Sequence, residues 1–112
     1  MKKIEAIIRP EKLDAVQNIL QLVGYGGMMV TEIEGHGRQK GAVQQWRGKE
    51  YRQEYIPKIK IEIVIKDKDV EETILAIISN ARTGEIGDGK IFVYNIEEAI
   101  RIRTGERGEK AL

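Results

Sequence analysis

The chain of 112 residues contains no cysteine and a single histidine. Without cysteine there is no disulfide framework and no thiolate metal site, and one histidine excludes the usual zinc clusters and any Cys–His nucleophile. The net charge of +1 argues against a general nucleic-acid coat and against a polybasic membrane binder. No apolar run approaches the ~18 residues that a membrane span needs, and no signal-peptide core follows the first residues. We therefore expect one cytoplasmic domain over residues 1–112, with no nucleic-acid partner and no direct membrane insertion.

Aromatic residues are also scarce, at 5% of the chain, so the core must consist of aliphatic side chains, among which isoleucine dominates. Alternation of hydrophobic and polar residues predicts strands. The clearest alternation places Ile59, Ile61, Ile63 and Ile65 on one face. The predicted strands span residues 3–9, 28–34, 58–66 and 90–96.

Between these strands, apolar residues recur at three- and four-residue steps over residues 11–23 and 70–81, which predicts two amphipathic helices. Pro10 suits the first turn of the first helix, and a glycine-rich segment ends that helix. Asp69 followed by Glu72 fits a capping pattern at the start of the second helix. The apolar stripes consist of Leu13, Val16, Leu20 and Val23 in the first helix and of Val70, Ile74, Ile77, Ile78 and Ala81 in the second.

Two strand–helix–strand units in series predict an α+β fold, with a four-stranded sheet and both helices on one face in the ferredoxin-like double βαβ arrangement. The helix-covered face would bury Ile4, Ile8 and the isoleucines of the third strand. The other face would carry Ile7, Val64 and part of the last strand, which makes it too apolar to face water. A large uncovered apolar sheet face usually marks an interface, so we expect a closed oligomer.

The long loop between the second and third strands, residues 37–55, has no sustained periodicity and is expected to lack regular structure. From His36 to Lys58 there are six Lys or Arg and two Asp or Glu, which gives a local charge of +4 and leaves −3 for the rest. Trp46, Tyr51 and Tyr55 stand among these charges. Aromatic residues and arginine on one loop are the usual ingredients of a binding hot spot. The alternative is a solvated hairpin with incidental charge.

A second glycine-rich stretch runs from Thr83 to Lys90. Its part from Gly84 onward satisfies the G-x-x-x-x-G-K pattern of a P-loop. However, Ile91 stands where a hydroxyl would hold magnesium, and a strand follows instead of a helix. Closely spaced glycines still let successive backbone N–H groups converge on an anion, and Lys90 adds a charge. The alternative is a tight turn from helix to strand.

A third basic element follows the last strand, where Arg101 and Arg103 would lie on the same side of an extended segment. Two guanidinium groups suit a polyphosphate, although an ordinary basic tail is the alternative. No catalytic constellation accompanies these groups, and the lone His36 reads as a loop residue rather than a base. The pattern indicates nucleotide binding without turnover.

Taken in order and at their spacing, these motifs resemble the PII nitrogen-regulatory signal proteins over essentially the whole chain. The resemblance implies a homotrimer of ferredoxin-like subunits with nucleotide sites in the clefts between neighbours. It also implies that ATP and ADP compete there and that 2-oxoglutarate binds only with Mg-ATP. The motifs are Gly35-His36-Gly37-Arg38-Gln39-Lys40-Gly41, Arg47-Gly48-Lys49-Glu50-Tyr51, Thr83 to Val93, and Arg101-Ile102-Arg103-Thr104-Gly105.

The resemblance also implies roles for single residues. Gln39 would hold Mg²⁺ and 2-oxoglutarate, and Val64 would lie beside the base. The implied nucleotide contacts are Met29, Gly35, Gly37, Arg38, Gln39, Val64, Gly87, Asp88, Gly89 and Lys90 from one subunit, with Arg101 and Arg103 from its neighbour. The implied 2-oxoglutarate contacts are Gln39, Lys40, Gly41 and Lys58, with the backbone of residues 37–41.

The long loop is the implied output element. Tyr51 stands at the position that many members uridylylate, and Trp46, Arg47 and Tyr51 would contact partners. The implied partners are an ammonium transporter channel, which would recruit the protein to the membrane, a glutamine synthetase adenylyltransferase or sensor kinase, and a uridylyltransferase. The sequence departs from the family pattern at His36, Met29, Trp46 and Lys49.

The leading interpretation is therefore a trimeric metabolite sensor that is not an enzyme. The alternative is a small ATP-hydrolysing or phosphate-transferring enzyme that uses the same loops, for which no base is identifiable. A ferredoxin-like RNA-binding module would need aromatic residues on the central strands. The chain has Ile61, Ile63 and Ile65 there instead.

Overall fold

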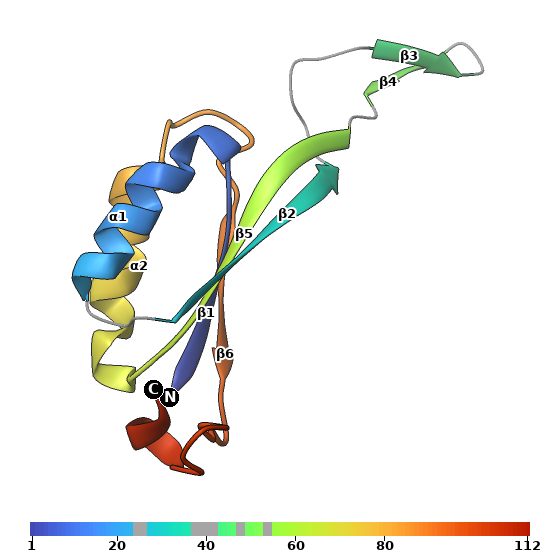
Figure 1. Ribbon diagram of the computed structural model, residues 1–112. Helices are drawn as coiled ribbons and strands as arrows, with labels where there is room; N and C mark the ends of the chain where they lie inside the picture. Colours follow the sequence, from blue (N-terminus) through green and yellow to red (C-terminus); the bar gives the residue numbers. More distant parts are fainter. Residues whose placement is uncertain (24–26, 37–42, 47–48, 53–54) are drawn as a thin grey trace.

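The computed structural model describes residues 1–23, 27–36, 43–46, 49–52 and 55–112. Its main sheet has four antiparallel strands in the order β2-β5-β1-β6, and both α-helices cover one face (Figure 1). This confirms the predicted α+β arrangement. The elements are β1 (Lys2–Ile8), α1 (Leu13–Val23), β2 (Met28–His36), β5 (Tyr55–Ile65), α2 (Val70–Ala81) and β6 (Lys90–Asn95).

The core lies between the sheet and the two helices. Strand register pairs Ile4 of β1 with Ile63 of β5 and Ile8 with Ile59, so the alternating isoleucines of both strands face the helices together. These side chains are buried, as the alternation predicted, and the helices close the core with their apolar stripes. The buried apolar residues are Ile4, Ala6, Ile8, Val16, Leu20, Ile59, Ile61, Ile63, Ile65, Ile77 and Ala81.

Each long helix is preceded by a 3₁₀ turn. Pro10 opens the turn before α1, in the role expected of it. Asp69 is the residue directly before α2, as the capping pattern predicted, but it ends a 3₁₀ turn at φ −99° and ψ −1° and its side chain makes no capping hydrogen bond. A capping side chain normally requires an extended backbone at that residue. Instead, the carbonyl of Asp69 accepts a hydrogen bond of 2.8 Å from the hydroxyl of Thr73, a buried polar residue outside the predicted stripe.

Strands β2 and β5 continue beyond the sheet body as a two-stranded arm (Figure 1). Strand β2 ends at His36 rather than at residue 34, and β5 already begins at Tyr55. The expectation that His36 is a loop residue is therefore wrong, because its backbone pairs with Tyr55. Two further strands, β3 (Val43–Trp46) and β4 (Lys49–Arg52), pair antiparallel with each other. The expectation of no regular structure over residues 37–55 is therefore wrong for these strands. A ribbon of two strands is held by backbone hydrogen bonds, which need no hydrophobic alternation in the sequence.

The sheet face opposite the helices carries a network of charges that the sequence analysis missed. Lys3 lies 3.1 Å from Glu62, and Lys60 lies 3.8 Å from Glu5 and 3.7 Å from Glu62. The hydroxyl of Tyr94 donates to Glu5 at 2.5 Å. We call these five residues the open-face cluster. The hydrogen bond from Lys3 lowers the pKa of Glu62, and the bond to Glu5 raises the pKa of Tyr94.

Apolar residues surround the open-face cluster, as predicted for this face. Ile7 and Val64 are half-buried, and Phe92 is 46% exposed. Within the described ranges, no helix combines the length and the apolar character that crossing a bilayer requires.

Candidate nucleotide-binding site

The glycine-rich loop between α2 and β6 lies at the end of the sheet where β1 finishes (Figure 1). Gly84, Gly87 and Gly89 have φ angles of 91°, 103° and 100°. Residues with a side chain rarely adopt such values, which explains why glycine recurs here. Alternation between negative and positive φ turns successive N–H groups to one side of the chain and creates a concave site for anions.

The carboxylate of Asp88 organises the first half of this loop. One oxygen accepts hydrogen bonds from the backbone N–H groups of Thr83 and Gly84 at 2.9 and 2.8 Å. The other accepts from the Thr83 hydroxyl at 2.5 Å and from Nε of Arg9 at 3.1 Å. The Thr83 hydroxyl, followed by the two N–H groups and Arg9, holds the pKa of Asp88 far below its usual range. Asp88 therefore stays ionised at neutral pH.

Two cations hold the backbone carbonyls of the same loop. Nη2 of Arg9 donates to the carbonyl of Ile86 at 2.9 Å, and Nζ of Lys58 donates to the carbonyl of Gly87. Arg9 follows the end of β1, whereas Lys58 comes from β5, so the loop is tied to both central strands. Lys58 is only 8% exposed. This burial, followed by the positive charge of Arg9, lowers the pKa of Lys58.

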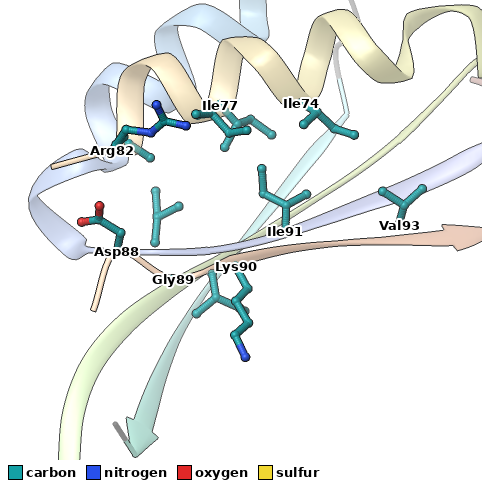
Figure 2. A pocket seen from close by; sticks show the side chains of 12 residues that line it. Ile74, Ile77, Arg82, Asp88, Gly89, Lys90, Ile91 and Val93 are labelled. Atoms are coloured by element: carbon teal, nitrogen blue, oxygen red, sulfur yellow. The ribbon is translucent and has the colours of Figure 1, made fainter. Parts of the chain in front are cut away.

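The last residue of the loop, Lys90, begins β6 opposite Ile7. Figure 2 shows its side chain extending to the side of the sheet away from α2. Because side chains alternate along a strand, Lys58 of β5 also belongs to this open face. Two lysines thus lie on one face of the sheet, next to a loop that can present N–H groups.

A hollow of about 430 Å³ lies on the opposite side, between α2 and strands β1 and β6 (Figure 2). Ile74, Ile77, Ile91 and Val93 give it an apolar wall. Asp88, Gly89 and Lys90 also line it, so the hollow adjoins the glycine-rich loop, although the side chain of Lys90 extends to the other side of the sheet (Figure 2). A smaller hollow of about 390 Å³ lies at the base of the arm, and Lys58 lines it together with the carboxylates of Glu32 and Glu34. Its other lining residues are Pro10, Ile33, Pro57 and Ile59.

Three other predicted contacts share the open face. Met29 is 55% exposed and pairs with Glu62, while Val64 pairs with Lys3. Gly35 lies next to Lys58, since a Cβ added at Gly35 would be 3.4 Å from Cγ of Lys58. The structure thus brings these residues to the same face of the sheet as Lys58 and Lys90.

Arg101 and Arg103 are not brought to this loop within one chain. They follow β6 at its far end, beyond Asn95, whereas Lys90 begins the strand (Figure 1). The extended segment expected for them is wrong, because the N–H of Gly105 donates to the carbonyl of Arg101 at 2.7 Å and closes a turn. Arg101 contacts Glu106 at 3.3 Å, and Arg103 is exposed.

The remaining predicted site residues fall outside the described ranges. This applies to Gly37, Arg38, Gln39, Lys40, Gly41 and Arg47. The backbones of Trp46 and Tyr51 belong to β3 and β4, but their side chains are not described. Within the part of the chain that is described, no three His, Cys, Asp or Glu side chains gather as metal ligands.

Arg9 is a residue of the candidate site that sequence reasoning missed. Its only local signal is a charge at the end of an alternating strand, directly before Pro10. Its partners Ile86 and Asp88 lie 77 and 79 positions away in the sequence. Local periodicity carries no information about such a pairing.

Comparison with known proteins places this geometry in a family. The model of the family "Nitrogen regulatory protein P-II" matches residues 1–106. The chain is 62% identical to the nitrogen regulatory protein P-II of Bradyrhizobium diazoefficiens and 61% identical to that of Rhodospirillum rubrum, in both cases over 112 residues and the full length of both chains. It is 54% identical over 112 residues to nitrogen regulatory protein P-II 2 of Methanothermobacter thermautotrophicus, covering all of this chain and 97% of that protein.

Identity at this level over the whole chain decides between the interpretations left open by the sequence. The relatives carry the name of regulatory proteins, and P-II proteins are signal-transduction regulators rather than enzymes. The phosphate-transferring enzyme considered above is thereby set aside. The chain belongs to the P-II family of nitrogen regulatory proteins.

Proposed function

We propose that this regulator senses nitrogen, carbon and energy status by binding ATP or ADP together with 2-oxoglutarate. The observation that carries the proposal is the loop from Thr83 to Lys90. Its positive-φ glycines are next to the cations Arg9, Lys58 and Lys90. A loop of this kind suits a polyphosphate, because its N–H groups and the ammonium group of Lys90 meet several anionic oxygens at once, while Arg9 and Lys58 hold the loop carbonyls.

The proposed nucleotide site uses the open face of one subunit. The backbone of Gly87 and Gly89 and the ammonium group of Lys90 bind the phosphates, and Val64 lies beside the base. The other contacts that we propose from this subunit are Met29, Gly35, Gly37, Arg38, Gln39 and Asp88.

A neighbouring subunit completes the proposed site. Arg101 and Arg103 lie at the far end of β6, so they reach the phosphates only from another copy of the chain. We propose a homotrimer assembled through the open face of the sheet. The half-buried Ile7 and Val64 support this assembly, as does the open-face cluster, whose two lysines balance two glutamates and so lower the cost of burying them.

Mg²⁺ and 2-oxoglutarate are proposed to join the nucleotide. Mg²⁺ in nucleotide sites is held mainly by phosphate oxygens and water, with one or two protein ligands. The residues present fit such a site with a single protein ligand. The carboxylate of Asp88 already accepts hydrogen bonds from the loop, whereas the amide oxygen of Gln39 is the hard type of ligand that Mg²⁺ prefers. Lys58 supplies a charge for the dicarboxylate, with further contacts from Gln39, Lys40 and Gly41.

Calorimetric titration tests this proposal. We expect 2-oxoglutarate to bind only when Mg-ATP is present. The factor by which 2-oxoglutarate tightens ATP binding should equal the factor by which ATP tightens 2-oxoglutarate binding. Replacing Arg103 or Lys90 by alanine should weaken ATP binding at least ~tenfold, because each removes a charge-assisted hydrogen bond of ~1.5–3 kcal/mol.

The matched control is Lys110→Ala, which removes a positive charge from the same C-terminal segment without touching a proposed contact. It should leave ATP affinity unchanged. Parent-like ATP binding by both Arg103→Ala and Lys90→Ala would contradict the assigned site. Tight 2-oxoglutarate binding without nucleotide would contradict the shared metal site.

The output element that we propose is the segment 37–55. It contains the β3–β4 ribbon at the end of the arm, with Trp46, Arg47 and Tyr51 as partner contacts (Figure 1). The proposed partners are an ammonium transporter channel and a glutamine synthetase adenylyltransferase or sensor kinase. Tyr51 is the proposed site for a uridylyltransferase. Binding to the transporter would bring the protein to the membrane.

Deleting residues 47–52 should abolish partner binding. ATP affinity and subunit assembly should be unchanged, because the deleted residues lie outside the sheet body and the loop from Thr83 to Lys90. Pull-down with the candidate transporter, alongside ATP titration and native mass spectrometry, measures all three quantities. Partner binding at parent strength by the deletion variant would show that another surface is the output element.

A further inference from the structure

The carboxylate of Asp88 has no remaining capacity to bind a ligand. A carboxylate offers about four lone-pair positions to donors. Each carboxylate oxygen of Asp88 already accepts two hydrogen bonds, at 2.5 to 3.1 Å. The donors are the N–H groups of Thr83 and Gly84 on one oxygen, and the Thr83 hydroxyl and Nε of Arg9 on the other. A negative charge facing phosphates would also oppose their binding. The Asp88 side chain therefore serves the loop itself.

Arg9 and Lys58 set the orientation of two successive peptide groups. The carbonyl of Ile86 faces Arg9 and the carbonyl of Gly87 faces Lys58. In a planar trans peptide, the N–H points opposite to the carbonyl. Turning these two carbonyls toward the cations therefore turns the N–H groups of Gly87 and Asp88 away from them. Two adjacent N–H groups are thus fixed on the other side of the loop.

The ion pair between Arg9 and Asp88 links these two sets of contacts. Arg9 binds the Asp88 carboxylate and the Ile86 carbonyl with different nitrogens, so one guanidinium fixes both halves of the loop. Both side chains are mostly covered, with exposures of 18% and 24%. A planar guanidinium is suited to such a two-point contact, which a lysine cannot reproduce.

We propose that Arg9 and Asp88 are positioning residues of the nucleotide site, which fix the loop from Thr83 to Lys90 in its phosphate-binding conformation without touching the phosphates through their side chains. This role rests on the proposed function. It assigns Asp88 to the site as an organiser of the backbone, and it adds Arg9, which the family resemblance did not supply.

The sign of the effect of Asp88→Asn on ATP affinity distinguishes this role from direct contact. If the carboxylate faced the phosphates, removing its charge would tighten ATP binding. If it positions the loop, the variant weakens ATP binding about tenfold, because the amide cannot accept from all the donors of the loop. Glu85→Gln is the matched control: it removes the same charge from an exposed side chain of the same loop and should leave ATP affinity unchanged or slightly tighter.

The second arm of the experiment is a double-mutant cycle on the complete protein. Arg9→Gln should weaken ATP about as much as Asp88→Asn, and the double variant should be little worse than either, because residues that act as a unit are not additive. Arg82→Gln removes the same charge from an exposed side chain near the loop and serves as its control. The loss of affinity in Asp88→Asn and Arg9→Gln should grow along the series adenosine, AMP, ADP and ATP, because only phosphate binding depends on the loop. Competition binding measures these affinities.

Hydrogen exchange in the nucleotide-free protein gives a readout independent of ATP. The amides of Thr83 and Gly84 should exchange faster in Asp88→Asn and Arg9→Gln than in the parent and in the two controls. Three results would overturn the positioning role. They are tighter ATP binding by Asp88→Asn, additive losses of ATP affinity in the double-mutant cycle, and equal losses of affinity for adenosine and for ATP. If the parent itself binds no nucleotide, the proposed function fails and this role fails with it; in the other outcomes parent binding is intact.

Discussion

Gly89→Ala should cost more than about 4 kcal/mol of the free energy of unfolding, or prevent folding altogether. Gly89 has a φ of 100°, which by itself costs a residue with a side chain about 1–2 kcal/mol. The larger part comes from its neighbour. A Cβ at this position would overlap the carbonyl oxygen of Ile7 and lie 2.7 Å from the carbonyl carbon. These are backbone atoms of the central strand β1, so relief requires the sheet to move.

Gly84→Ala is the matched control in the same loop. Gly84 has a similar φ of 91°, but an added Cβ would meet nothing within 4 Å. Gly84→Ala should therefore lower the free energy of unfolding only by the cost of the positive φ angle, about 1–2 kcal/mol. Urea denaturation at one fixed protein concentration compares the two variants with the parent. Equal losses would show that the approach of Gly89 to β1 is not what requires glycine.

Leu20→Ala should lower the free energy of unfolding by about 2–5 kcal/mol. Leu20 is 1% exposed and packs in α1 against the isoleucine core, so truncation removes buried contacts and leaves a cavity.

Leu22→Ala isolates the contribution of burial. Leu22 stands two residues further along the same helix and is 81% exposed. The same atoms are removed and the helix propensity changes equally, so its effect should stay within about 0.5 kcal/mol. The same urea experiment measures both. A loss of 2 kcal/mol or more in Leu22→Ala, roughly that of a buried leucine, would mean that the outer face of α1 is covered in the assembled protein.

The sequence predicted the parts of this fold that depend on local periodicity. The isoleucines of β5 alternate over residues 59–65, and every one of them is buried against the helices. Periodicity failed where hydrogen bonding decides the conformation. The turn that contains Arg101 and Arg103 is closed by the N–H of Gly105, and the β3–β4 ribbon pairs through its backbone. Neither arrangement requires a repeating hydrophobic pattern.

For the candidate site, the glycines of the loop and Lys90 could be singled out from the sequence because their chemistry is visible in the residue types. The pairing of Arg9 with Asp88 was not, since it joins positions 79 residues apart. Asp88 illustrates the difference. Its place in a glycine-rich motif marks it as part of the site, but only its hydrogen bonds reveal that the carboxylate faces the loop rather than outward.

The placement of Lys90 and Arg101 at opposite ends of β6 has a consequence for mixed assemblies. In the proposed trimer, each copy gives its loop to one site and its arginines to the next. A copy defective at both ends therefore disables two sites at once, while a copy defective at one end disables a single site. When one copy lacks a working loop and its neighbour lacks the arginines, the arginines of the first copy and the loop of the second can still form one intact site. A site contained within each chain could show neither effect, because each defective copy would then lose its own site and no other.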